Sequence, residues 1–239
     1  MRKLMSAEWY RLRHSGAFIV IILLAVFIPV IIPFFMEYSV KTADVTASEV
    51  LYIITTNAPF FAVVIPVAIG ASISSSYSNK IAYYEVMDGN NIHKIILSKL
   101  FVHTSFATVS YWIPTATFLL WAYTKNGTDL WLEDFSVTLI LYIILLLRST
   151  IGGTLFVTLT RSPIGAALPY IRLMLESMTD MIFAESNPLY KFMPSTQMMA
   201  YLMDPNDKSI IWAIVLTTIF EIAALYICSY IGFKKKHFK

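Results

Sequence analysis

Residues 74–99 read SSSYSNKIAYYEVMDGNNIHKIILSK, the longest polar, lysine-bearing interruption between apolar runs of this 239-residue chain. On both sides the sequence is mostly apolar over lengths that match the hydrocarbon core of a bilayer. Within the stretch, Tyr77 to Met87 is predicted to form a short helix, and Asp88-Gly89-Asn90-Asn91 is a strong turn signal. We therefore expect an elbow between two membrane helices, at which the chain meets a partner.

The composition is that of an integral membrane protein. Hydrophobic residues make up 57% of the chain and charged residues 14%, whereas soluble domains carry about a quarter charged residues. A membrane-spanning helix needs about 20 apolar residues, and six stretches qualify: 17–36, 51–73, 100–122, 135–158, 163–182 and 209–232. We predict one all-α polytopic membrane domain over residues 1–239, with six transmembrane helices and little chain left for a soluble domain.

The distribution of lysine and arginine predicts the orientation of these spans. With the N-terminus inside, twelve of the 18 basic residues fall on inner segments and four on outer ones, which is the bias typical of cytosolic loops. The other two, Arg148 and Arg172, fall within spans. We expect a multi-pass protein whose termini and elbow face the cytosol. The inner basic residues are Arg2, Lys3, Arg11, Arg13, Lys80, Lys94, Lys99, Arg161, Lys234, Lys235, Lys236 and Lys239.

Residues 2–14 are predicted to form an amphipathic helix in the inner headgroup layer, with Trp9 as its interface anchor. Glu8 falls in the middle of the apolar arc of this helix. A bare carboxylate there is costly, so we expect Glu8 to have a partner, either Arg11 or a residue of the elbow. The alternative, in which Glu8 points into headgroup water, stays open.

Four charged residues fall near the middle of predicted spans: Arg148, Arg172, Glu176 and Glu221. An unpaired charge at that depth costs at least about 2.5 kcal/mol, so we expect these residues to pair between the last three spans. Two roles stay open from the sequence. The pairs can lock the bundle together, or the charged groups can line a substrate path or relay protons.

No catalytic or cofactor motif is present. The phosphate loop GxxxxGK[ST] is absent, as are HExxH and GxSxG. Cys228 is the only cysteine, which excludes an intramolecular disulfide framework. The four histidines (His14, His93, His103 and His237) are not spaced as metal ligands and are expected to face the headgroups. We therefore expect no catalytic residue, metal site or cofactor site in this chain, and no nucleic-acid partner.

In the order of these features the chain resembles the ABC-2-type permeases, the membrane subunits of bacterial ATP-binding-cassette exporters, over nearly its whole length. The resemblance rests on the N-terminal helix MSAEWYRLRHS (5–15), on the elbow with Glu85-Val-Met-Asp-Gly89 followed by a basic-aliphatic run to Lys99, and on the broken segment Phe192-Met-Pro194-Ser before the last span. The segment between Gly89 and Lys99 is shorter than is usual in this family. This departure leaves open the length of the coupling helix, the cytosolic helix in the elbow on which the ATPase of such exporters docks.

The resemblance implies a half-transporter of a bacterial plasma membrane that is not itself an enzyme. A separate cytosolic ATPase, holding ATP and Mg, would dock on a coupling helix in the elbow, and a second permease, identical or related, would complete the path. Compact permeases of this kind resemble exporters of peptides, including antimicrobial peptides and lantibiotics, so an amphipathic or hydrophobic substrate is expected. The coupling residues would be Tyr83, Tyr84, Glu85, Met87, Asp88 and Gly89.

Two other functions remain possible from the sequence. The chain can be a scaffold or sensor subunit that binds a partner and transports nothing, or an intramembrane enzyme that modifies lipid. A co-purifying ATPase favours the transporter over both. Membrane lipids are expected partners in every case.

Overall fold

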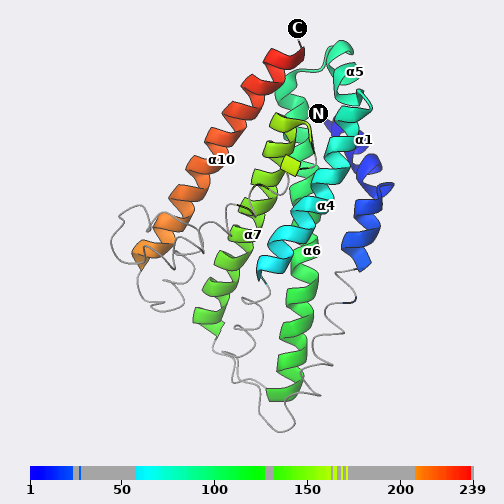
Figure 1. Ribbon diagram of the computed structural model, residues 1–239. Coiled ribbons are helices and arrows are strands. Elements are labelled where there is room, and N and C mark those ends of the chain that lie inside the picture. The colour runs from blue at the N-terminus through cyan, green and yellow to red at the C-terminus, as the bar shows by residue number, and fades with distance from the viewer. Residues whose placement is uncertain are drawn as a thin grey trace.

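The computed structural model describes residues 1–23, 58–126, 132–162 and 208–237, together with the single residues 27, 164, 165, 168 and 171. Over these residues the regular structure is helical, as the sequence predicts, and contains no strand. Four long helices run side by side, with the short helix α5 at one end of the bundle (Figure 1). The helices are α1 (Arg2–Arg13), α4 (Ala58–Ser78), α5 (Ile81–Met87), α6 (Ile92–Asn126), α7 (Leu132–Thr160) and α10 (Lys208–His237).

The long helices coincide with four of the six predicted spans. The spans predicted at 51–73, 100–122, 135–158 and 209–232 lie largely within α4, α6, α7 and α10. Among the described residues, two stretches are by length and composition long and apolar enough to cross a membrane, Ile140–Thr160 and Ser209–Lys235. The span at 163–182 and the segment 183–207 lie almost wholly outside the described residues, as does the span at 17–36 beyond residue 23. The number of six spans therefore stays a prediction.

Helix α7 lies at the centre of the described bundle and packs against α4, α6 and α10. One face of α4 buries Ile65, Ile69 and Ile73, which are spaced by four residues and so lie one above another. These side chains join a single apolar cluster with buried residues of α6 and α7 that include Val102, Phe106, Tyr111, Tyr142 and Leu146. Burial of apolar surface of this kind holds helices together in water, and close packing does so in a bilayer.

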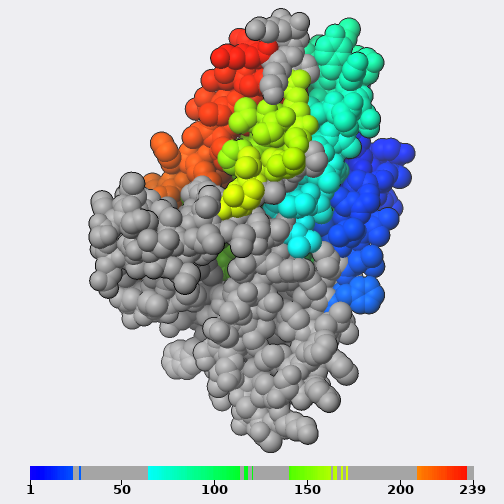
Figure 2. Space-filling view, in the orientation of Figure 1, coloured from blue at the N-terminus to red at the C-terminus, as the bar shows by residue number. Residues whose placement is uncertain are grey.

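Among the described residues, helix α10 packs on its neighbours along one side. Ile214 is buried against α7, and the Ser229 hydroxyl donates a hydrogen bond of 2.9 Å to the Leu155 carbonyl. Figure 2 shows α10 along one flank of the molecule and α1 along the other. The outer side of α10 exposes large apolar side chains along its whole length: Trp212, Leu216, Ile219, Phe220, Ile227 and Ile231.

Helix α4 ends later than the predicted span at 51–73 and runs through the serine-rich segment to Ser78. The Ser74, Ser75, Ser76 and Ser78 hydroxyls each donate a hydrogen bond to the backbone carbonyl three residues earlier. Because the hydroxyls are satisfied within the helix, the polar run does not end it. The prediction that one short helix covers Tyr77 to Met87 is therefore wrong at its start.

Two backbone reversals isolate α5 from its neighbours. Lys80 adopts a left-handed conformation (φ 56°) between α4 and α5, and Gly89 adopts φ 80° after α5. Gly tolerates that region without steric cost, which explains its place in the turn. The Asn91 side-chain oxygen then accepts a hydrogen bond of 2.9 Å from the His93 amide and caps the start of α6. The turn predicted at residues 88–91 is thus confirmed.

Candidate functional site

The buried face of α1 carries a charged residue. Leu4, Glu8 and Leu12 are spaced by four residues and are the buried residues of this helix. Leu4 and Leu12 supply apolar contact, whereas Glu8 places a carboxylate in the same stripe with only 2% of the residue exposed. Trp9, the predicted interface anchor, is 44% exposed and makes edge contacts with Phe18 and Phe106.

The buried face of α6 carries the complementary charge. Ile95, Ile96, Val102 and Phe106 are buried at helical spacing, and Lys99 lies in the middle of their stripe with none of its surface exposed. Helices α1 and α6 pack directly on each other. Their two buried stripes therefore bring Glu8 and Lys99 together.

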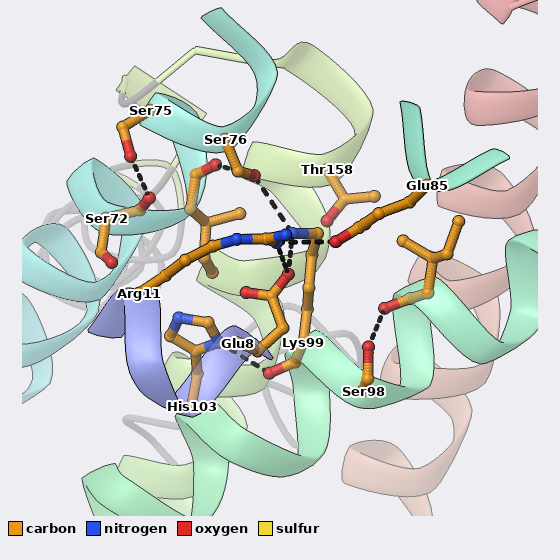
Figure 3. Close-up of polar contacts among 12 residues, drawn as sticks. Glu8, Arg11, Ser72, Ser75, Ser76, Glu85, Ser98, Lys99, His103 and Thr158 are labelled. Atoms are coloured by element: carbon orange, nitrogen blue, oxygen red, sulfur yellow. Dashed lines mark hydrogen bonds and ion pairs between the residues drawn. The ribbon is translucent and has the colours of Figure 1, made fainter. Parts of the chain in front are cut away.

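The two charges form the centre of a hydrogen-bonded cluster (Figure 3). Lys99 Nζ donates to Glu8 Oε1 at 2.5 Å and to the Ser76 hydroxyl at 3.1 Å. It also lies 5.6 Å from the centre of the Tyr77 ring, within reach of a cation–π contact. Arg11 Nη1 donates to the same Glu8 oxygen at 2.7 Å. Glu8 thus has two cationic partners, Arg11 and a residue of the elbow, and the expectation that it is paired is confirmed.

The surrounding cations decide the protonation of Glu8. Burial by itself would raise the pKa of this carboxyl, but the charge of Lys99, its hydrogen bond to Glu8 and the charge of Arg11 outweigh burial and hold the pKa below its ordinary value of 4.5. Glu8 is therefore a carboxylate at neutral pH. A buried ion pair of this kind adds little net stability, but loss of one partner is costly because the other charge stays buried.

Arg11 also reaches the elbow. The Nη1 atom that bonds Glu8 lies 2.7 Å from Glu85 Oε1 of α5. Neither carboxylate oxygen of Glu85 accepts a hydrogen bond from the described residues, so this contact is an attraction between charges without hydrogen-bond alignment. The Glu85 backbone carbonyl accepts hydrogen bonds from the Asn90 amide and side chain, which close the turn after α5.

The predicted coupling residues divide into two groups. Tyr83, Tyr84 and Met87 are 43%, 57% and 65% exposed and form the outer surface of α5. Glu85, which the resemblance implies as a further coupling residue, is only 7% exposed and points inward to Arg11, so it is not part of this outer surface. Asp88 and Gly89 are exposed in the turn that ends α5. The helix at the position where the resemblance implies a coupling helix, α5, has seven residues.

The second predicted charge cluster is formed in part. Arg148 of α7 donates from Nε to Glu221 Oε2 of α10 at 2.6 Å, and a second guanidinium nitrogen pairs with the same oxygen. Arg148 Nη1 also donates to the Thr217 and Thr218 hydroxyls. The expected pairing of a buried arginine with Glu221 is therefore confirmed for this pair. Arg172 and Glu176 lie outside the described residues.

Sequence reasoning missed Lys99, Ser76 and His103 as members of the first cluster. His103 was expected to face the headgroups, but it is 1% exposed and its Nδ1 lies 2.7 Å from the Lys99 carbonyl oxygen. The signal was present in the spacing, because positions 95, 99, 102, 103 and 106 form one helical stripe. Lys99 was counted with the inner basic residues instead.

The arrangement is suited to holding helices in a fixed relation and shows no catalytic constellation. Among the described residues, no three His, Cys, Asp or Glu side chains are placed to hold a metal ion. Comparison of the chain with protein-family models, curated proteins and solved structures finds no match. The features of the described residues that bear on function are this cluster and the exposed surface of α5.

Proposed function

We propose that this chain is the permease subunit of an ABC-2-type ATP-binding-cassette exporter. The observation that carries the proposal is the construction of α5. This seven-residue helix exposes two tyrosines and a methionine on its outer side. On its inner side the buried Glu85 is tied to the bundle by an ion pair with the partly exposed Arg11. Aromatic residues and methionine are enriched in protein interfaces. A small exposed knob on a fixed base is suited to receive a partner and to pass its movement inward.

In this proposal the α5 end of the molecule faces the cytosol, and a separate ATPase docks there. The orientation is supported by the basic residues at that end, which cytosolic surfaces favour. The start of α6 and the end of α10 meet there through the stacked rings of His93 and Tyr230, with centres 4.0 Å apart. The exposed basic residues of α1, of the turn between α4 and α5, and of these two helix ends are Arg2, Lys3, Arg13, Lys80, Lys94, Lys234 and Lys235.

The remaining parts follow from the same proposal. A chain with a single permease domain forms half of a transport path, so a second permease, identical or related, pairs with it in a bacterial plasma membrane. The cargo is a peptide or another amphipathic molecule. The Arg148–Glu221 pair acts as a lock between α7 and α10, because Arg148 is buried and donates hydrogen bonds to three side chains of α10.

The test is to purify the tagged full-length chain from its native membrane and to assay ATP hydrolysis in the eluate. Tyr84→Ala and Met87→Ala remove exposed side chains of α5 and are expected to lower the co-purified ATPase activity at least about tenfold, as for interface positions that dominate binding. Tyr10→Ala is the matched control, since Tyr10 is an equally exposed tyrosine on α1. It is expected to leave the activity unchanged.

Two outcomes contradict the proposal. If no ATPase activity co-purifies with the wild-type chain, the chain does not work with an ATPase. That result favours a scaffold or sensor subunit or a lipid-modifying enzyme. If an ATPase co-purifies but its activity never responds to any candidate peptide in reconstituted vesicles, the chain is a scaffold or sensor. Glu85→Ala is a poor probe of docking because it also breaks a buried contact.

A further inference from the structure

Helix α5 has few buried groups with which to hold its position. Ala82 and Glu85 are its buried residues, and alanine contributes little apolar area. The Glu85 carboxylate, in contrast, is buried and receives no hydrogen bond from the described residues. Among the described residues, its ion-pair partner is Arg11, at 2.7 Å. The position of the elbow therefore depends strongly on the charge that Arg11 offers to Glu85.

That charge is shared. The same Arg11 nitrogen lies 2.7 Å from Glu8 Oε1 and 2.7 Å from Glu85 Oε1, so two buried carboxylates compete for it (Figure 3). Lys99 relieves the competition because its ammonium group neutralises Glu8 from the other side at 2.5 Å. With Lys99 present, two cations face two carboxylates and the cluster is neutral. Without Lys99, one guanidinium must serve both carboxylates.

We propose that Lys99 and Arg11 are positioning residues for the elbow. Lys99 neutralises the Glu8 carboxylate. The charge of Arg11 therefore remains available to Glu85, and this contact holds α5 in position. The chain of contacts runs from α6 through α1 to α5. It makes α5 sensitive to Lys99 of α6, with which α5 forms no described hydrogen bond or ion pair. The inference deepens the proposed function, since it assigns the route by which a movement of α5 reaches the long helices. In this role α1 transmits movement in addition to lying at the membrane surface.

The inference is tested on the chain alone by hydrogen–deuterium exchange of the full-length protein in nanodiscs of phosphatidylethanolamine and phosphatidylglycerol. Lys99→Met is expected to raise the amide exchange rate of residues 81–87 about tenfold or more, because it leaves an uncompensated carboxylate beneath α5. Lys94→Met is the matched control. Lys94 lies on the same helix, five positions earlier, and is exposed, so its removal is expected to leave exchange in α5 unchanged.

Two further variants separate charge sharing from a simple loss of packing. Glu8→Gln combined with Lys99→Met removes one charge of each sign and leaves Arg11 to Glu85, so exchange in α5 is expected to return to the wild-type rate. Lys99→Arg keeps the charge and is expected to recover most of the protection. A purely structural role of Lys99 predicts instead that the double variant exchanges at least as fast in α5 as Lys99→Met.

The inference is overturned if Lys99→Met speeds exchange in α1 and α6 but leaves α5 unchanged, or if the double variant does not restore α5. Exchange of α7 and α10 serves as the check that a variant is folded. If Lys99→Met fails to fold, the double variant Glu8→Gln with Lys99→Met still tests charge sharing, because its cluster carries one cation and one carboxylate and is neutral. No ATPase is present in these samples, so the result is independent of whether an ATPase is found to dock on α5.

Discussion

Glu8 and Lys99 are 91 positions apart in the chain, and their charged groups meet at 2.5 Å. Glu8 comes from the first helix and Lys99 from the start of a helix of 35 residues. Both side chains are almost completely buried. Since a buried charge without a partner is strongly unfavourable, the contact specifies how α1 must lie on α6.

Replacement of Glu8 by glutamine is expected to destabilise the protein by about 3–5 kcal/mol, the usual cost when one partner of a buried pair is lost. The Lys99 ammonium group would then be left with the Ser76 hydroxyl and the Tyr77 ring. Thermal unfolding in detergent measures the effect. Asp88→Asn removes an exposed acid and is expected to change the midpoint little. An effect of Glu8→Gln no larger than that of Asp88→Asn would show that the pair does not hold α1.

The docking of α1 is expected to depend on pH in the acid range only. Because the pKa of Glu8 in the docked helix lies below 4.5, docking gains stability from this group at pH values above 4.5. That stability is lost as pH falls below 4.5 and through the lowered pKa of the docked state. The measurement is the distance between spin labels at Tyr10→Cys and Phe101→Cys in a Cys228→Ser background, in samples frozen at a series of pH values.

The label distance should stay narrow from neutral pH down to about 4.5 and should broaden below it. Glu8→Gln is the control, because a residue that cannot ionise removes this transition. A transition that persists unchanged in Glu8→Gln, or one that is centred well above 4.5, contradicts the assignment to Glu8.

The sequence predicted those features that depend on local pattern. Glu8 breaks the apolar arc of a short amphipathic helix, and this sufficed to predict that it has a partner. The turn at Asp88-Gly89 also follows from local chemistry, because Gly89 supplies the positive φ that most residues avoid.

The features that were missed depend on which helix faces which. A count of basic residues treats Lys99 and Lys94 alike, although Lys99 is buried and Lys94 is exposed. The end of α4 was missed for a different reason. A serine run favours a break when its hydroxyls compete for the backbone, but here each described hydroxyl of the run bonds back along the helix. Glu85 lies on the inner side of α5 because it pairs with Arg11, a residue more than 70 positions earlier in the chain. A local pattern does not indicate such a partner.

The Arg148–Glu221 pair is expected to hold α10 on α7. Glu221→Gln removes the carboxylate and leaves a buried guanidinium, with an expected cost of about 1–3 kcal/mol, less than for a fully buried pair because the Glu221 side chain is 21% exposed. The charge exchange Arg148→Glu with Glu221→Arg is expected to recover part of the loss. Thermal unfolding and transport of a candidate peptide are measured on the same variants.

The two roles left open for this pair predict different results. If the pair is a lock, the exchanged variant recovers stability and transport together. Recovery of stability without transport would indicate that the charges line the path. If the exchanged variant is no more stable than Glu221→Gln, the pairing does not hold the helices.

The turn after α5 offers a probe of the elbow that leaves the buried charges untouched. Gly89 has φ 80° with no atom within 4 Å of an added Cβ, so Gly89→Ala meets backbone strain and no clash. The expected cost is about 1–2 kcal/mol, the usual penalty of the left-handed region for a residue with a side chain. Hydrogen–deuterium exchange should locate the effect in residues 81–91.

Gly16→Ala is the matched control, since Gly16 also has open space around an added Cβ but no positive φ. It is expected to be neutral or slightly stabilising, as alanine is favoured over glycine in a helix. If both variants behave alike, the conformation of Gly89 does not set the position of the elbow.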